Sequence, residues 1–75
     1  MYIVSRKNCQ NCNILKSMLG DKIITTNIIN AEENMNLCRK LNIKSVPALV
    51  KDDETVVYEL DEIVTEVERN YLLSK

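Results

Sequence analysis

Short β-branched runs and segments of helical periodicity alternate along the first part of the chain. The apolar residues of segment 2–5 predict a buried strand. In residues 10–19 the apolar side chains recur every three or four positions, which predicts a helix with one buried face, and Gly20 is suited to its end. Residues 23–29, rich in isoleucine and threonine, predict a second strand.

The polar residues that follow predict a second helix. Asn30 with Glu33 three positions later is typical of a helix N-terminus. The predicted helix carries Met35, Cys38 and Leu41 on one face, and the basic residues near its end suit the helix dipole.

The rest of the chain predicts a hairpin and a long helix. Residues 48–50 predict a short strand, 51–54 a polar turn and 55–58 the returning strand. From residue 60 to residue 75 the apolar side chains again recur at helical spacing.

The predicted element order, β-α-β-α-β-β-α, gives an α/β fold in a single domain, residues 1–75. The first two strands are joined through a helix, so they should be parallel with a right-handed crossover. The last two strands form a hairpin and should be antiparallel. We therefore expect a mixed four-stranded sheet packed between helices.

Composition and charge argue against several classes of partner. The net charge is −1, both signs are mixed along the chain, and there are three aromatic residues. Neither a nucleic-acid surface nor a polybasic membrane anchor is expected from such a pattern. The first residues lack the basic and apolar stretches of a signal peptide, and no apolar run is long enough to span a membrane. We expect a monomeric, cytoplasmic protein without nucleic-acid or membrane partners.

The chain has three cysteines and no histidine. Cys9 and Cys12 form a C-x-x-C pair, whereas Cys38 stands alone. A secreted scaffold held by disulfides normally has a larger, even number of cysteines, so the pattern favours a reducing compartment and a catalytic or metal-binding pair. We interpret Cys38 as a small buried apolar side chain, with a regulatory or dimer-forming thiol as the alternative.

The C-x-x-C pair falls at the predicted junction between the first strand and the first helix. A helix N-terminus offers unpaired N–H groups and a positive dipole end, and both stabilise a thiolate. We therefore predict that Cys9 is the nucleophile, helped by the nearby charges of Arg6 and Lys7. Cys12 lies one turn further along the same face, where it can resolve a mixed disulfide.

A second motif, Ser45-Val46-Pro47, directly precedes the predicted strand 48–50. Together with the C-x-x-C pair and the element order, it resembles thioredoxins and glutaredoxins over essentially the whole chain; glutaredoxins often have Thr-Val-Pro here. The resemblance implies a thioredoxin-like three-layer sandwich, a cis Pro47 opposite the dithiol and a Val46 backbone that pairs with an extended substrate. The alternative for Pro47 is an ordinary trans proline at the start of an edge strand.

The same resemblance implies a thiol–disulfide oxidoreductase that reduces protein disulfides through Cys9 and Cys12. Ribonucleotide reductase and general disulfide repair are the clients that it suggests. Lys7 precedes the pair, Gln10 and Asn11 lie between its two cysteines, and all three are expected to contact the substrate. We expect no bound cofactor and no metal.

The residues after the predicted hairpin differ from the glutaredoxin pattern, and this difference bears on which electron donor the protein uses. Glutaredoxins hold the glutathione carboxylate with a Gly-Gly pair and a polar step after the hairpin, where this chain has Glu59, Asp61 and Glu62. Like charges there should weaken glutathione binding, although Lys7 and Lys44 remain available as contacts. We therefore favour recharging by a thioredoxin-reductase-type flavoprotein with NADPH, with glutathione as the alternative.

A copper metallochaperone is the rival from another class, because two thiolates suit Cu(I). Such proteins usually have Met-Thr before the first cysteine and end on a strand. Here Lys7-Asn8 precedes Cys9, the last predicted element is a helix, and Pro47 has no counterpart. We therefore rank the metallochaperone below both redox interpretations.

Overall fold

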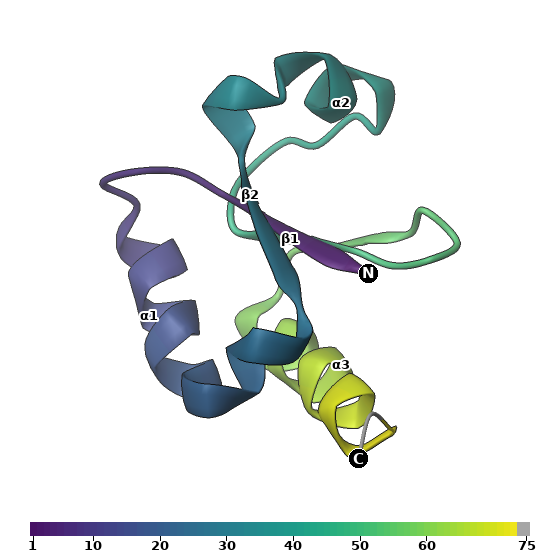
Figure 1. Ribbon diagram of the computed structural model, residues 1–75. Helices are drawn as coiled ribbons and strands as arrows, with labels where there is room; N and C mark the ends of the chain where they lie inside the picture. The colour runs from purple at the N-terminus through teal and green to yellow at the C-terminus, as the bar shows by residue number, and fades with distance from the viewer. Residues whose placement is uncertain (74–75) are drawn as a thin grey trace.

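The computed structural model describes residues 1–73, without the side chains of Ile24 and Thr25. It has an α/β fold in which three α-helices and two short 3₁₀ helices accompany a four-stranded sheet (Figure 1). The elements are β1 (Tyr2–Ser5), α1 (Gln10–Leu19), η1 (Gly20–Thr25), β2 (Asn27–Asn30), η2 (Ala31–Glu33), α2 (Met35–Lys40), β3 (Ala48–Val50), β4 (Val56–Val57) and α3 (Leu60–Leu73).

The sheet is mixed, as the sequence predicts, with the strand order β2-β1-β3-β4. β1 pairs with β2 in parallel and with β3 in antiparallel orientation, and β3 and β4 form the antiparallel hairpin. β1 and β3 are therefore the central strands, and both are largely or fully buried.

The two faces of the sheet carry separate core clusters. Successive strand residues point to opposite faces, so Ile3 and Leu49 lie on one face and Val4 and Ala48 on the other. The first face packs against α1 and α3 through buried side chains: Leu15, Leu19, Ile63 and Val67. The second face packs against partly buried side chains of the α2 region: Ala31, Cys38, Leu41 and Ile43. Figure 1 shows the resulting layers, with α2 on one side of the sheet and α1 and α3 on the other.

The predicted strand over residues 23–29 is wrong in its first half. Gly20 ends α1 with a φ of 55°, and its N–H donates to the Lys16 carbonyl oxygen. The chain then continues as η1, closed by a 3.1 Å bond from the Thr26 N–H to the Ile23 carbonyl oxygen. Ile23 packs against the same core cluster as α1 and α3, so burial of its side chain overrides its β propensity.

The predicted start of the second helix is confirmed, but the helix is interrupted. The Asn30 side chain accepts the Glu32 N–H at 2.7 Å and caps η2. The Asn34 side chain then donates to the Asn30 carbonyl oxygen at 2.8 Å, the acceptor that the Asn34 N–H would use in a continuous α-helix. That N–H instead bonds to Ala31 at 3.1 Å, and α2 begins at Met35.

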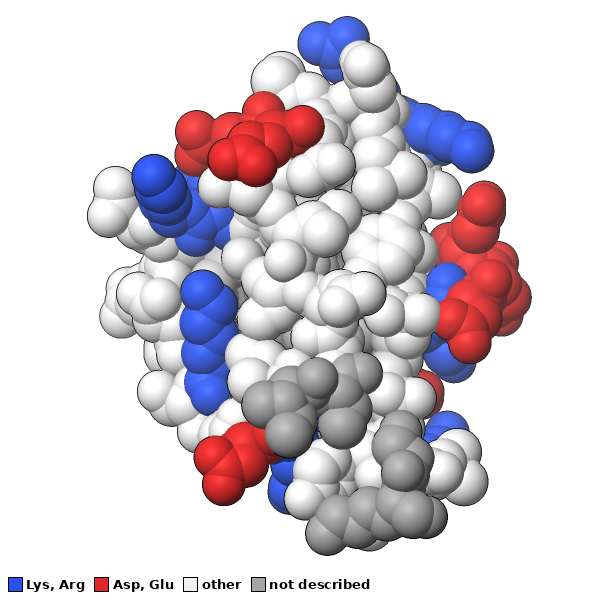
Figure 2. Space-filling model, viewed as in Figure 1, with Lys and Arg blue, Asp and Glu red and all other residues white. Residues whose placement is uncertain are grey.

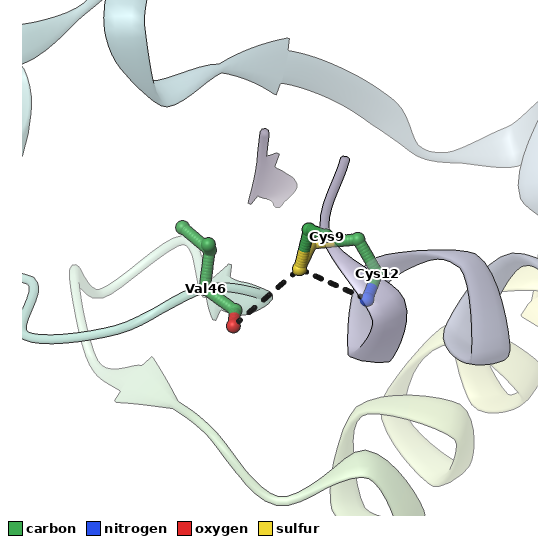
Figure 3. Close-up of a disulfide and its surroundings, with 3 residues drawn as sticks. All are labelled: Cys9, Cys12 and Val46. Atoms are coloured by element: carbon green, nitrogen blue, oxygen red, sulfur yellow. Dashed lines mark hydrogen bonds between the residues drawn. A yellow bond between two sulfur atoms is a disulfide. The ribbon is translucent and has the colours of Figure 1, made fainter. Parts of the chain in front are cut away.

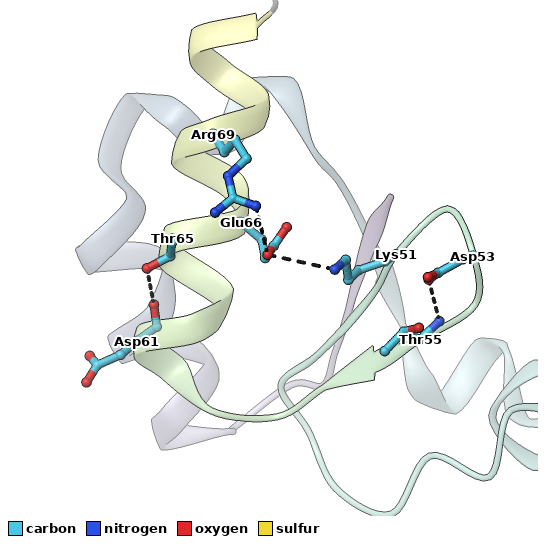
Figure 4. Close-up of polar contacts among 7 residues, drawn as sticks. All are labelled: Lys51, Asp53, Thr55, Asp61, Thr65, Glu66 and Arg69. Carbon is cyan, nitrogen blue, oxygen red and sulfur yellow. Dashed lines mark hydrogen bonds and ion pairs between the residues drawn. The ribbon is translucent and has the colours of Figure 1, made fainter.

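The hairpin is confirmed, with a shorter returning strand than predicted. Residues 55–58 contribute only β4, Val56–Val57, to the ladder. The Thr55 N–H donates to Asp53 Oδ1 at 3.0 Å within the turn (Figure 4). The Tyr58 hydroxyl accepts the Lys44 N–H at 3.1 Å, which ties the end of the hairpin to the loop before β3.

The predicted last helix is confirmed as α3 up to Leu73, and positions 74–75 lie outside the described residues. Glu66 on α3 links this helix to the end of β3, because its Oε1 lies 3.8 Å from Lys51 Nζ and 3.5 Å from the Arg69 guanidinium (Figure 4). On the face of the molecule shown in Figure 2, basic and acidic groups both lie around the rim, and the centre is largely uncharged. No helix within residues 1–73 combines the length and apolarity needed to cross a membrane.

Candidate active site

Cys9 lies where the loop after β1 enters α1. Asn8 turns the chain there with a φ of 57°, a conformation that asparagine adopts more readily than most residues. Cys9 is the N-cap residue of α1, and its Sγ accepts the Cys12 N–H at 3.2 Å. The sulfur therefore occupies the place that a serine or aspartate oxygen usually takes at a helix start.

Cys12 is the buried member of the pair. Its side chain is 1% exposed, whereas Cys9 is half-buried and borders an open groove. The two Sγ atoms lie at disulfide distance, with the Cα atoms 5.2 Å apart. An external reagent can therefore reach Cys9 more readily than Cys12.

The Val46–Pro47 segment lies against this pair. The peptide bond is cis, as the family resemblance implied, and Pro47 is buried. The Val46 carbonyl oxygen is 3.9 Å from Cys9 Sγ. Figure 3 shows the Cys9 sulfur between this oxygen and the Cys12 backbone nitrogen.

The pairing of β1 with β3 explains how two motifs so far apart in sequence meet. Val4 on β1 pairs with Ala48 on β3. Pro47, the residue before β3, therefore lies beside Ser5 at the end of β1. Cys9 follows this end of β1 through a short loop. Antiparallel pairing of adjacent strands therefore brings Pro47 to the dithiol.

A groove with a volume of about 710 Å³ opens beside Cys9, between the loop after β1, the α2 region and the segment before β3. Among its lining residues, Val46 was a predicted site residue, Arg6 a predicted helper and Lys44 a predicted contact. Ser45, from the predicted motif Ser45-Val46-Pro47, also lines the groove. The sequence assigns no role in the site to the remaining lining residues: Ala31, Met35, Cys38, Arg39, Asn42 and Ile43. No local signal marks these residues, because their proximity to Cys9 depends on how the α2 region packs on the sheet.

The other predicted substrate contacts lie outside this groove. Lys7 is exposed in the loop before Cys9, and Gln10 and Asn11 are exposed in the first turn of α1. They are next to the dithiol along the chain, but they do not line the groove.

The acidic residues near the start of α3 do not line the groove either. Asp61 and Glu62 line a different hollow together with Lys51 and Glu66, and Glu59 is exposed. These acidic side chains are therefore not among the residues that line the groove beside Cys9.

Cys38 has a mixed environment. It packs against the second core cluster, in line with the prediction of a small apolar side chain, but it is only half-buried and also lines the groove. Burial raises the pKa of the nearby Tyr2, with smaller contributions from Glu54 and from Cys38. Within the described part of the chain, no three histidine, cysteine or acidic side chains gather as they would around a metal ion.

Comparison of the chain with protein-family profiles, with curated proteins and with solved structures finds no significant match.

Proposed function

We propose that this protein is a thiol–disulfide oxidoreductase that reduces protein disulfides through Cys9 and Cys12. One observation carries the proposal: an accessible sulfur accepts an N–H bond at the start of a helix, with a second, buried sulfur at disulfide distance. The N–H bond and the helix dipole both favour the charged form of the Cys9 sulfur, and the thiolate is the form that attacks disulfides.

The fold supports the same proposal. The strand order β2-β1-β3-β4, the helices on both faces and a cis Val46–Pro47 bond next to Cys9 are the arrangement expected of a thioredoxin-like protein. In this fold the functional residues lie at one end of the central strands, which is where Cys9 and Val46 meet.

The proposed reaction proceeds in two exchanges. The Cys9 thiolate attacks one sulfur of the substrate disulfide; that bond breaks, a mixed disulfide forms, and the departing substrate thiolate takes up a proton. Cys12 then loses its proton and attacks the Cys9 sulfur, which releases the second substrate thiolate. Two electrons have passed to the substrate, and the Cys9–Cys12 disulfide remains. We expect the Val46 backbone, whose carbonyl oxygen lies 3.9 Å from Cys9 Sγ, to pair with an extended substrate segment during both steps.

Recharging requires an electron donor, for which we propose a thioredoxin-reductase-type flavoprotein that uses NADPH. Glutathione is the second candidate, and one observation favours it: the groove beside Cys9 is lined by basic rather than acidic side chains. Reduction of the oxidised protein by NADPH plus a thioredoxin reductase, compared with reduction by glutathione, separates the two. Faster reduction by glutathione at matched concentrations would replace the first candidate with the second.

The proposed function is tested by disulfide turnover with a protein substrate such as insulin. All variants are made in a Cys38→Ser background, so that the pair supplies the only thiols. The background should retain turnover, Cys9→Ser should abolish it, and Cys12→Ala should stop at a mixed disulfide visible by mass spectrometry. Turnover that survives Cys9→Ser would rule out the proposed function.

A further inference from the structure

The groove beside Cys9 has a one-sided charge. Three cationic side chains line it, and each comes from a different segment: Arg6 from the loop after β1, Arg39 from α2 and Lys44 from the loop before β3. No aspartate or glutamate is among the lining residues. This is unexpected for a chain with a net charge of −1.

These three charges are also uncompensated by ion pairs. Within residues 1–73, none of the three side chains lies within ion-pair distance of a carboxylate. Outside the groove, Lys22 lies 3.3 Å from Glu68, whereas Lys7, Lys16 and Lys40 also have no ion pair within residues 1–73. All three groove cations are exposed, so their field extends into the groove and towards the reactive sulfur.

The groove also offers apolar surface. Met35, the first residue of α2, lines the groove and is 55% exposed. The partly buried Ile43 and Val46 also line the groove. A volume of about 710 Å³ lies within the range of roughly 300–1,000 Å³ that encloses ligands of many atoms, so the groove is far larger than a single anionic group requires. Its occupant should therefore combine negative charge with apolar side chains.

We infer that the groove binds an extended, acidic segment next to the target cysteine of a protein substrate, and that it selects substrates by this charge. The inference rests on the proposed exchange at Cys9, because the bound segment must carry the disulfide that Cys9 attacks. Charge complementarity identifies the segment as acidic, and the position of Cys9 in the groove lining places the target cysteine there. Apolar side chains of the segment contact Met35 and Ile43.

The test compares three peptides of equal length with the same central disulfide, flanked by acidic, by neutral or by basic residues. The whole protein is used with the electron donor that recharges it, NADPH plus thioredoxin reductase or glutathione, and kcat/KM is measured for each peptide at low and at high ionic strength. We expect a preference for the acidic over the basic peptide of about tenfold or more at low salt, which shrinks as salt screens the groove. Equal kcat/KM for the three peptides would refute the inference and leave the proposed function intact, whereas no turnover of the peptides and none of insulin would refute both.

Two substitutions on α2 provide a matched pair. Arg39→Glu and Lys40→Glu change the net charge equally, on neighbouring exposed residues of one helix, but only Arg39 lines the groove. Arg39→Glu should remove most of the preference for the acidic peptide, and Lys40→Glu should retain it. Lys44→Glu, on a different segment, should act as Arg39→Glu does. Equal loss in Arg39→Glu and Lys40→Glu would show that overall charge, and not the groove, sets the preference.

Oxidised glutathione is measured in parallel as a small anionic disulfide. If Arg39→Glu slows only the reaction with glutathione and leaves the peptide preference unchanged, the groove serves a small thiol and the inference is overturned.

Discussion

The burial difference between the two cysteines predicts that serine and alanine have opposite effects at positions 9 and 12. At the N-cap, serine in place of Cys9 keeps an acceptor for the Cys12 N–H, whereas alanine leaves this N–H without its partner. Loss of an N-cap acceptor costs about 0.5–2 kcal/mol, so Cys9→Ser should be the more stable variant by about that amount.

At position 12 the order should invert. Cys12 is 1% exposed, so serine would place a hydroxyl in a buried site of the apolar core. A buried hydroxyl without a good partner costs about 1–3 kcal/mol. Cys12→Ala should therefore be more stable than Cys12→Ser by about 1–3 kcal/mol. This is a large share of the roughly 4–11 kcal/mol expected for the whole 75-residue chain.

The assay is urea unfolding of the four variants under reducing conditions, followed by far-UV circular dichroism. With a slope of about 1 kcal/mol per molar urea, the two position-12 variants should differ in midpoint by about 1–3 M, with alanine higher. The two position-9 variants should differ by about 0.5–2 M, with serine higher. The same sign at both positions would refute the burial difference on which the roles of nucleophile and resolving cysteine rest.

Three further predictions concern the scaffold. Asn30→Ala removes the acceptor of the Glu32 N–H and should lower the free energy of unfolding by about 1 kcal/mol, measured by urea unfolding; an unchanged midpoint would contradict the cap. Ile63→Ala, at a fully buried position of the first core cluster, should cost about 2–5 kcal/mol and Ile63→Val about 0.5–1.5 kcal/mol, and equal costs would contradict close packing there. Hydrogen bonds from Thr55 lower the pKa of Asp53, so the stability that wild type has over Asp53→Asn should be present at neutral pH. This difference in the free energy of unfolding between wild type and Asp53→Asn should be lost as the pH falls through the lowered pKa of Asp53. A difference that grows as the pH falls would contradict the prediction.

Local signals were enough where the neighbouring sequence decides the structure. The consecutive apolar residues Ile3 and Val4 predict a buried strand, and they lie on opposite faces of the sheet. Gly20 marks the end of the first helix, where its positive φ suits glycine. The position of Cys9 at the start of α1 follows from the helical periodicity of residues 10–19.

Tertiary packing and a single side-chain bond decided the rest. Ile23 belongs to a β-branched run, but in the structure it packs in a 3₁₀ turn against the core, which no local pattern indicates. Asn34 interrupts the second helix through its bond to the Asn30 carbonyl oxygen. The groove could not be predicted because Arg39 and Lys44 approach Cys9 only once the α2 region is packed on the sheet.

The central claim is that the first turn of α1 holds the Cys9 sulfur as an accessible thiolate. It is tested most directly by pulse alkylation of the reduced protein with iodoacetamide over a series of pH values, with each cysteine quantified by mass spectrometry. We predict that Cys9 is labelled first, and that its rate reaches half its maximum at a lower pH in the folded chain than in the urea-unfolded chain. Faster labelling of Cys12 than of Cys9, or the same pH dependence in folded and unfolded chains, would contradict the account.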